Sequence, residues 1–64
     1  MKSISLAAAR TDAELTQEES AKALDISKST YISYEKGRTQ PSLEMAARMA
    51  NLFGFELNEI RFSK

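Results

Sequence analysis

The sequence predicts an all-α protein, a compact five-helix bundle in which two short helices meet at a tight turn. Apolar residues recur at helical spacing between residues 43 and 53. Hydroxyl side chains that can cap a helix stand before three of the expected helices, at Thr16, Ser27 and Ser42. With 64 residues and no cysteine or histidine, the chain is expected to form one domain over 1–64, stabilised by helix packing alone.

The first two helices are separated by a clear start signal. The first is predicted from about residue 3 or 4 to Asp12. Its candidate inward residues are Leu6, Ala7, Ala9 and Ala13. Thr16, followed three residues later by Glu19, has the spacing of a capping box, which predicts a second helix over about 17–24.

The link between the second and third helices is only three residues long, Asp25-Ile26-Ser27. Such a link requires a sharp change of direction, and Asp25 is expected to take the left-handed backbone conformation. Ser27 repeats the start signal, so the third helix is predicted over about 28–35. Gly37 then provides a natural stop.

The remaining chain is predicted to form two more helices. Pro41 forces an extended connection, and Ser42 caps a fourth helix over about 43–53. Its predicted core stripe is Leu43, Ala46, Met49, Ala50 and Phe53. Gly54 ends that helix, and a short fifth helix is expected around residues 57–60.

The third helix has two different faces at 100° per residue. Tyr31, Tyr34 and Glu35 fall on the side expected to point inward. The opposite side carries Ser29, Ile32, Ser33 and Lys36, with Lys28 in the first turn. Small polar side chains on an outward face allow a helix to enter the major groove of DNA, which is about 12 Å wide.

Four sequence blocks, residues 15–19, 26–30, 34–38 and 41–43, occur in an order and spacing that resemble the Cro-like helix-turn-helix repressors. That family of phages and mobile elements includes the DNA-binding domain of the lambda repressor and the xenobiotic-response-element regulators. The resemblance covers nearly the whole chain. It implies a lambda-repressor-like DNA-binding domain and a sequence-specific regulator of transcription, a repressor of phage or mobile-element type, with helix 28–35 in the major groove.

The resemblance also implies which side chains contact double-stranded DNA. They are Gln17, Ser27, Lys28, Ser29, Ile32, Ser33, Lys36, Arg38 and Thr39. Lys28 is the strongest candidate for reading a guanine, whereas Gln17 is expected to bond a phosphate beside the dipole of its helix. Ile32 either contacts a thymine methyl group or is simply an exposed apolar residue, and Arg38 could contact a phosphate or reach the minor groove.

Arg10 and Glu35 are predicted to form a structural ion pair between the first helix and the end of the third. A surface pair would contribute little to stability. Because Glu35 is expected on the inward side of its helix, the partly buried alternative is favoured here.

Several residues depart from the family pattern. Glu14 and Asp25 stand where glycine is frequent, which predicts slightly strained turns. Ser20 stands where an aliphatic side chain is common, and the bulky Tyr31 could fill the volume that Ser20 leaves.

The net charge is zero, with nine basic and nine acidic residues, which is unusual for a DNA-binding protein. The charges are unevenly distributed, since residues 12–25 sum to −4 and residues 26–41 to +2. Zero net charge favours one alternative, a protein-interaction or antitoxin-like module with the same fold. A salt-dependent affinity for DNA would separate the two hypotheses.

Other functions are not expected. The chain has no histidine or cysteine and no glycine-rich phosphate loop, so neither an enzyme, nor a metal site, nor a cofactor, nor a small-molecule substrate is predicted. No apolar run is long enough for a membrane span, and no signal peptide is recognised, which predicts a cytoplasmic protein associated with the nucleoid of a bacterial host.

A single motif contacts only a few base pairs, so a weak homodimer is expected on a palindromic operator, formed either in free solution or only on DNA. The candidate dimer surface is Leu57, Ile60 and Phe62. The alternative is that these three apolar residues complete the core.

Overall fold

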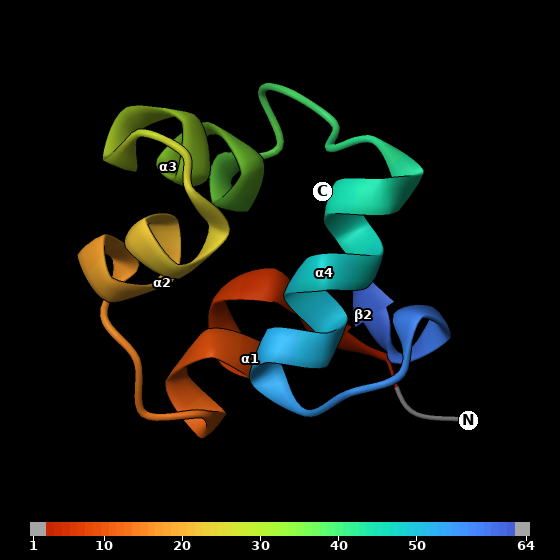
Figure 1. Ribbon diagram of the computed structural model, residues 1–64. Coiled ribbons are helices and arrows are strands. Elements are labelled where there is room, and N and C mark those ends of the chain that lie inside the picture. The colour runs from red at the N-terminus through yellow and green to blue at the C-terminus, as the bar shows by residue number, and fades with distance from the viewer. Residues whose placement is uncertain (1–2, 63–64) are drawn as a thin grey trace.

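Four α-helices account for most of residues 3–62, the part of the chain that the computed structural model describes (Figure 1). The helices are α1 (Leu6–Asp12), α2 (Gln17–Leu24), α3 (Lys28–Lys36) and α4 (Leu43–Phe53). Within this range, the chain also forms one 3₁₀ turn, η1 (Leu57–Glu59), and two short strands, β1 (Ile4–Ser5) and β2 (Ile60–Arg61). None of the helices in residues 3–62 is long and apolar enough to cross a membrane.

The predicted helix starts in the middle of the chain are confirmed. The Thr16 hydroxyl accepts a hydrogen bond from the Glu19 N–H at 3.0 Å, and the Glu19 carboxylate accepts one from the Thr16 N–H at 2.8 Å. This reciprocal capping box satisfies two backbone donors that a helix start would otherwise leave unpaired. The hydroxyls of Ser27 and Ser42 cap α3 and α4 with a single bond each, accepted from the N–H of Thr30 and of Met45.

The prediction of an all-α bundle with five helices is wrong at both ends of the described chain. Strand β1 pairs with β2 in a parallel register, Ile4 with Ile60 and Ser5 with Arg61. Helix α1 therefore begins only at Leu6. The expected fifth helix is the single turn η1, after which the chain continues into β2. Strands of two residues leave no detectable periodicity in a sequence, so the pattern could not reveal them.

The core lies between α1, α4 and the inner sides of α2 and α3. Its buried residues are Leu6, Ala9, Ala21, Leu24, Tyr31, Met49, Ala50, Phe53 and Ile60. Two expected inward residues of α1, Ala7 and Ala13, are only half-buried. Leu43 is wrong as a core residue, since 75% of it is exposed. It is the first residue of α4, and that end of the helix extends beyond the elements that cover the rest (Figure 1).

The turns after α1 and α2 contain two non-glycine residues in the left-handed conformation, as predicted. The φ angle is 61° at Glu14 and 60° at Asp25. An L-residue with a β-carbon is strained there by roughly 1–2 kcal/mol, although aspartate tolerates the conformation better than glutamate does. Glu14 therefore represents an avoidable cost in stability.

Replacing Glu14 with glycine should raise the free energy of unfolding by about 0.5–1 kcal/mol, because glycine adopts a positive φ without steric penalty. Urea denaturation measures the change. Ala47, exposed in the middle of α4, is the control, since its replacement by glycine should instead destabilise the domain by about 1 kcal/mol. A less stable Glu14→Gly protein would show that the Glu14 side chain makes a stabilising contribution larger than the strain.

Candidate nucleic-acid interface

A tight turn places α3 against α2, and the two helices lie together at one side of the molecule (Figure 1). At the turn, the N–H groups of Asp25 and Ile26 donate to carbonyls in the last turns of α2, those of Lys22 and Ala21, at 3.1 and 3.0 Å. Ala21 is 3% exposed, and its small side chain lies in the core. The sharp link predicted at residues 25–27 therefore fixes the direction of α3 relative to α2.

One side of α3 is anchored in the core and the other faces outward. Tyr31 is fully buried, and Tyr34 packs against the core. The exposed side presents Lys28, Ser29 and Lys36, with Ile32 and Ser33 partly exposed. This division agrees with the two faces predicted from the sequence. It leaves a surface of short polar side chains and lysines, with one partly exposed isoleucine, on a helix that its tyrosines hold in place.

The cap residue of α3, Ser27, already uses its hydroxyl within the helix. Its Oγ accepts from the Thr30 N–H at 3.1 Å and donates to the Thr30 Oγ1 at 2.9 Å. The single hydroxyl proton of Ser27 is thus engaged, although an oxygen lone pair remains. For Ser27, capping is the role that the geometry supports directly.

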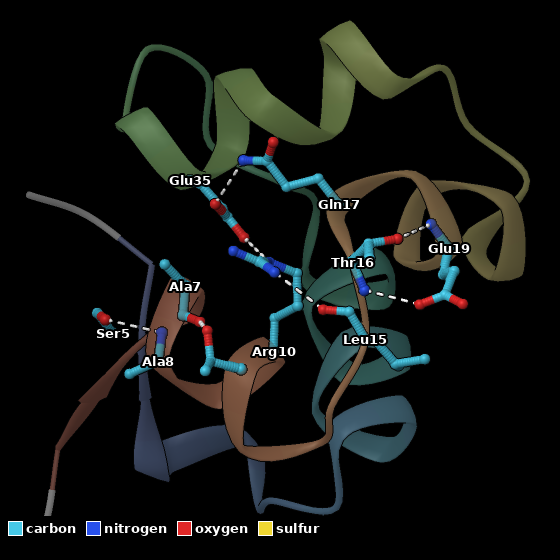
Figure 2. Close-up of polar contacts among 10 residues, drawn as sticks. Ser5, Ala7, Ala8, Arg10, Leu15, Thr16, Gln17, Glu19 and Glu35 are labelled. Carbon is cyan, nitrogen blue, oxygen red and sulfur yellow. Dashed lines mark hydrogen bonds and ion pairs between the residues drawn. The ribbon is translucent and has the colours of Figure 1, made fainter.

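Arg10, Gln17 and Glu35 form a polar network that joins three helices (Figure 2). The Arg10 Nε lies 2.7 Å from the Glu35 Oε2, and the Arg10 Nη1 donates to the Leu15 carbonyl at 2.9 Å. The side chains of Arg10 and Glu35 are 18% and 7% exposed, so this is the partly buried alternative of the expected ion pair. The second carboxylate oxygen, Oε1, accepts from the Gln17 Nε2 at 2.9 Å.

This environment keeps Glu35 ionised. Burial alone would raise the pKa of the Glu35 carboxyl, but the hydrogen bonds from Arg10 and Gln17 outweigh it and hold the pKa below its ordinary value. The bond to Glu35 in turn raises the pKa of Arg10. Burial, together with the neighbouring carboxylate, raises the pKa of Tyr31, which stays a neutral phenol.

Two buried hydroxyl groups have no hydrogen-bond partner within the described residues, those of Ser20 and Tyr31. Both residues are fully buried. They are the pair that the sequence marked as departures from the family pattern. Each hydroxyl that remains unpaired in the core has a cost in stability.

The connection after α3 adds further exposed groups beside the polar face. Gly37 ends the helix at a φ of 75°, and the Arg38 N–H donates back to the Ser33 carbonyl at 3.0 Å. The side chains of Arg38 and Thr39 are exposed. The structure thus brings these residues next to the end of α3, so that they continue its outward surface.

The predicted dimer surface is not supported as a set of three exposed residues. Ile60 is only 7% exposed, because β2 pairs with β1 and directs it into the core. Phe62 is partly buried and packs against the same core. Leu57, at 36% exposure, is available to a partner, and Phe62 stays partly exposed. For Ile60, the alternative that it completes the core is the correct one.

The sequence did not predict the bond between Gln17 and Glu35. It placed Gln17 at the start of α2 and Glu35 near the end of α3 but related them separately to a phosphate and to Arg10. Their separation of 18 residues gives no periodic signal. The inward position of Glu35 was the available clue, since a buried carboxylate requires donors beyond a single arginine.

Two short helices at a tight turn, the second anchored by aromatic residues and polar on its outward face, define a helix-turn-helix protein. Comparison with known proteins agrees: the family described as Helix-turn-helix matches residues 6–60. The chain belongs to this family.

Three relatives illustrate the match. An uncharacterized HTH-type transcriptional regulator of Methanocaldococcus jannaschii is 46% identical over 46 residues, which cover 72% of this chain and 70% of that protein. The cryptic phage CTXphi transcriptional repressor RstR of Vibrio cholerae is 37% identical over 51 residues, covering 80% of this chain but 46% of the repressor. An uncharacterized HTH-type transcriptional regulator of Archaeoglobus fulgidus is 35% identical over 51 residues, covering 80% of this chain and 72% of that protein. No solved structure matches.

Proposed function

We propose that this protein is a sequence-specific, double-stranded DNA-binding regulator of transcription, a repressor of phage or mobile-element type that inserts α3 into the major groove. The outward face of α3 carries the proposal. It is polar and unobstructed, and it belongs to a helix fixed by the buried Tyr31. The relative from Vibrio cholerae, named as a phage transcriptional repressor, supports the same function.

The proposed contacts fall into two groups. Residues that face the bases are Lys28, Ser29, Ile32 and Ser33, with Ser27 at the helix start. Residues that contact phosphates are Gln17, Lys36, Arg38 and Thr39. Lysine can donate to guanine O6 and N7, and serine hydroxyls can donate or accept at several bases. Phosphate contacts position the domain but carry no sequence information.

We further propose that two copies bind a palindromic operator as a weak homodimer, with half-sites about 34 Å apart. One domain reads too few base pairs to select a single site in a genome. Leu57 is the most exposed of the three residues of the expected dimer surface. Binding to a chromosome or to phage DNA would place the protein in the cytoplasm.

Selection of bound duplexes from a random pool tests the function. The expected result is a conserved short sequence, repeated in inverted orientation at a spacing of one helical turn. Footprints of the selected DNA should show two protected half-sites. Recovery of random sequences with no enrichment would contradict sequence-specific binding, and a single half-site would contradict the homodimer.

Replacing Arg38 with alanine should weaken binding to every duplex by a similar factor and should reduce the slope of log K against log salt by about one, because one phosphate neutralisation is lost. Fluorescence anisotropy over a series of salt concentrations measures the slope. Arg48→Ala is the matched control, since Arg48 lies in α4 and donates to the Leu24 carbonyl instead. An unchanged slope for Arg38→Ala would remove Arg38 from the set of phosphate contacts.

Zero net charge favours a second candidate function, a protein-interaction or antitoxin-like module. The charge around α3 nevertheless supports DNA binding. Basic side chains are exposed at the start of the helix, Lys28, and at and after its end, Lys36 and Arg38. The salt series separates the two functions, because an interaction module would show no steep loss of DNA affinity with salt.

A further inference from the structure

The side chain of Gln17 is held by a neighbour instead of extending freely from α2. Gln17 is the first residue of that helix, and it is half-buried. Figure 2 shows its side chain crossing from the start of α2 to Glu35 on α3, where the amide nitrogen meets the carboxylate. The amide group of Gln17 therefore has a fixed position beside the outward surface.

The chemistry of the bond also fixes which way the amide points. An ionised carboxylate can only accept hydrogen bonds, so the NH₂ group of Gln17, and not its carbonyl, must face Glu35. One of the two N–H bonds is used at 2.9 Å. Among residues 3–62 no acceptor bonds the second N–H, and a phosphate oxygen is a pure acceptor that this N–H can bond.

The carboxylate that holds Gln17 cannot itself move. Its other oxygen is bound by the Arg10 Nε at 2.7 Å, and Arg10 is fixed in turn by the Leu15 carbonyl. The Glu35 side chain is 7% exposed. Because the Glu35 carboxylate is buried and accepts hydrogen bonds on both oxygens, it orients the Gln17 side chain more firmly than water would.

We propose that Glu35 is a positioning residue of the DNA interface, which holds the Gln17 amide so that its second N–H meets a phosphate at the start of α2. This inference rests on the proposed function. Glu35 does not touch DNA in this arrangement. It acts through Gln17, so that affinity for DNA depends on the network that also stabilises the fold.

A double-mutant cycle on DNA affinity tests the coupling. Gln17→Met keeps the length of the side chain but removes its hydrogen bonds, and it should raise the Kd for the selected duplex by about tenfold. In the Arg10→Met/Glu35→Met background, which leaves no unpaired buried charge, the same change should raise the Kd less than about twofold. Asn51→Leu, an amide removed from the exposed face of α4, is the control and should leave the Kd unchanged in both backgrounds.

Nuclear magnetic resonance provides a readout that requires no DNA. In the unchanged chain, one side-chain amide proton of Gln17 should be shifted strongly downfield by its bond to the carboxylate, and this shift should collapse in the Arg10→Met/Glu35→Met protein. The inference would be overturned if Gln17→Met reduced the affinity equally in both backgrounds. It would also be overturned if the Gln17 amide signal were the same in the unchanged chain and in the Arg10→Met/Glu35→Met protein. Neither result would contradict DNA binding itself. If the unchanged chain bound no duplex, the proposed function and this inference would fail together.

Discussion

Replacing Arg10 with methionine should lower the free energy of unfolding by about 3 to 5 kcal/mol at neutral pH, because the change leaves the Glu35 carboxylate buried without its cation. The double variant Arg10→Met/Glu35→Met should recover much of this loss, since it buries no charge. Recovery will be incomplete, because Gln17 loses its acceptor and the Leu15 carbonyl loses its donor. Urea denaturation of the unchanged chain, of both single variants, Arg10→Met and Glu35→Met, and of the double variant measures these changes.

The pH dependence of the free energy of unfolding provides an independent check on the ion pair between Arg10 and Glu35. The pKa of Glu35 is lower in the folded protein than its ordinary value, so the folded state favours the ionised carboxylate. The stabilisation is therefore complete above the ordinary pKa of glutamate and is lost as the pH falls through the lowered pKa. The free energy of unfolding of the double variant should lack this acid-sensitive contribution. Lys36→Met, at an exposed neighbour of Glu35, is the control and should change stability little. Small additive effects of the Arg10 and Glu35 changes would show that the pair contributes no more than a surface salt bridge.

Replacing Lys28 with alanine should weaken binding to the selected site by about 1 to 3 kcal/mol, which is roughly a fivefold to 150-fold rise in Kd, while hardly changing affinity for random DNA. The reason is that Lys28, exposed in the first turn of α3, is placed to donate to a guanine. Titration of the same protein with selected and scrambled duplexes measures the ratio.

Lys36→Ala is the matched control for Lys28. Lys36 is also an exposed lysine of α3, but it lies at the other end of the helix, where a phosphate contact is proposed. Its loss should weaken binding to both duplexes by a similar factor. If Lys28→Ala also reduced both affinities equally, Lys28 would be a phosphate contact and the base-reading role would pass to other residues of the outward face.

The parts of the fold that depend on neighbours in sequence were predictable. Thr16 and Glu19 lie three residues apart, and their capping box follows from that spacing alone. The positive φ angle at Asp25 was predictable from the short link after a helix, whereas the one at Glu14 was indicated only by the resemblance, since the family often has glycine at that position. The two faces of α3 followed from helical periodicity, which placed Tyr31 inside and Lys28 outside.

The parts that depend on distant segments were not predictable. The pairing of Ile4 with Ile60 decides that α1 starts late and that Ile60 is buried, yet neither residue carries a signal of the other. Leu43 fits the spacing of the α4 core stripe, but it is 75% exposed, because no element within residues 3–62 covers it. The bond from Gln17 to Glu35 likewise depends on how α2 and α3 meet.

The pairing of β1 with β2 also has a consequence for how the protein acquires its structure during synthesis. Strand β1 and helix α1 leave the ribosome before residues 60–61, the partner of β1, which are made about 55 residues later. The helix-turn-helix segment emerges in between, while Leu6 and Ala9 still lack Ile60 in their shared core. Closure of this long-range pairing must follow translation of Arg61, so a ribosome stalled before that point would hold a chain that is easily cleaved by proteases.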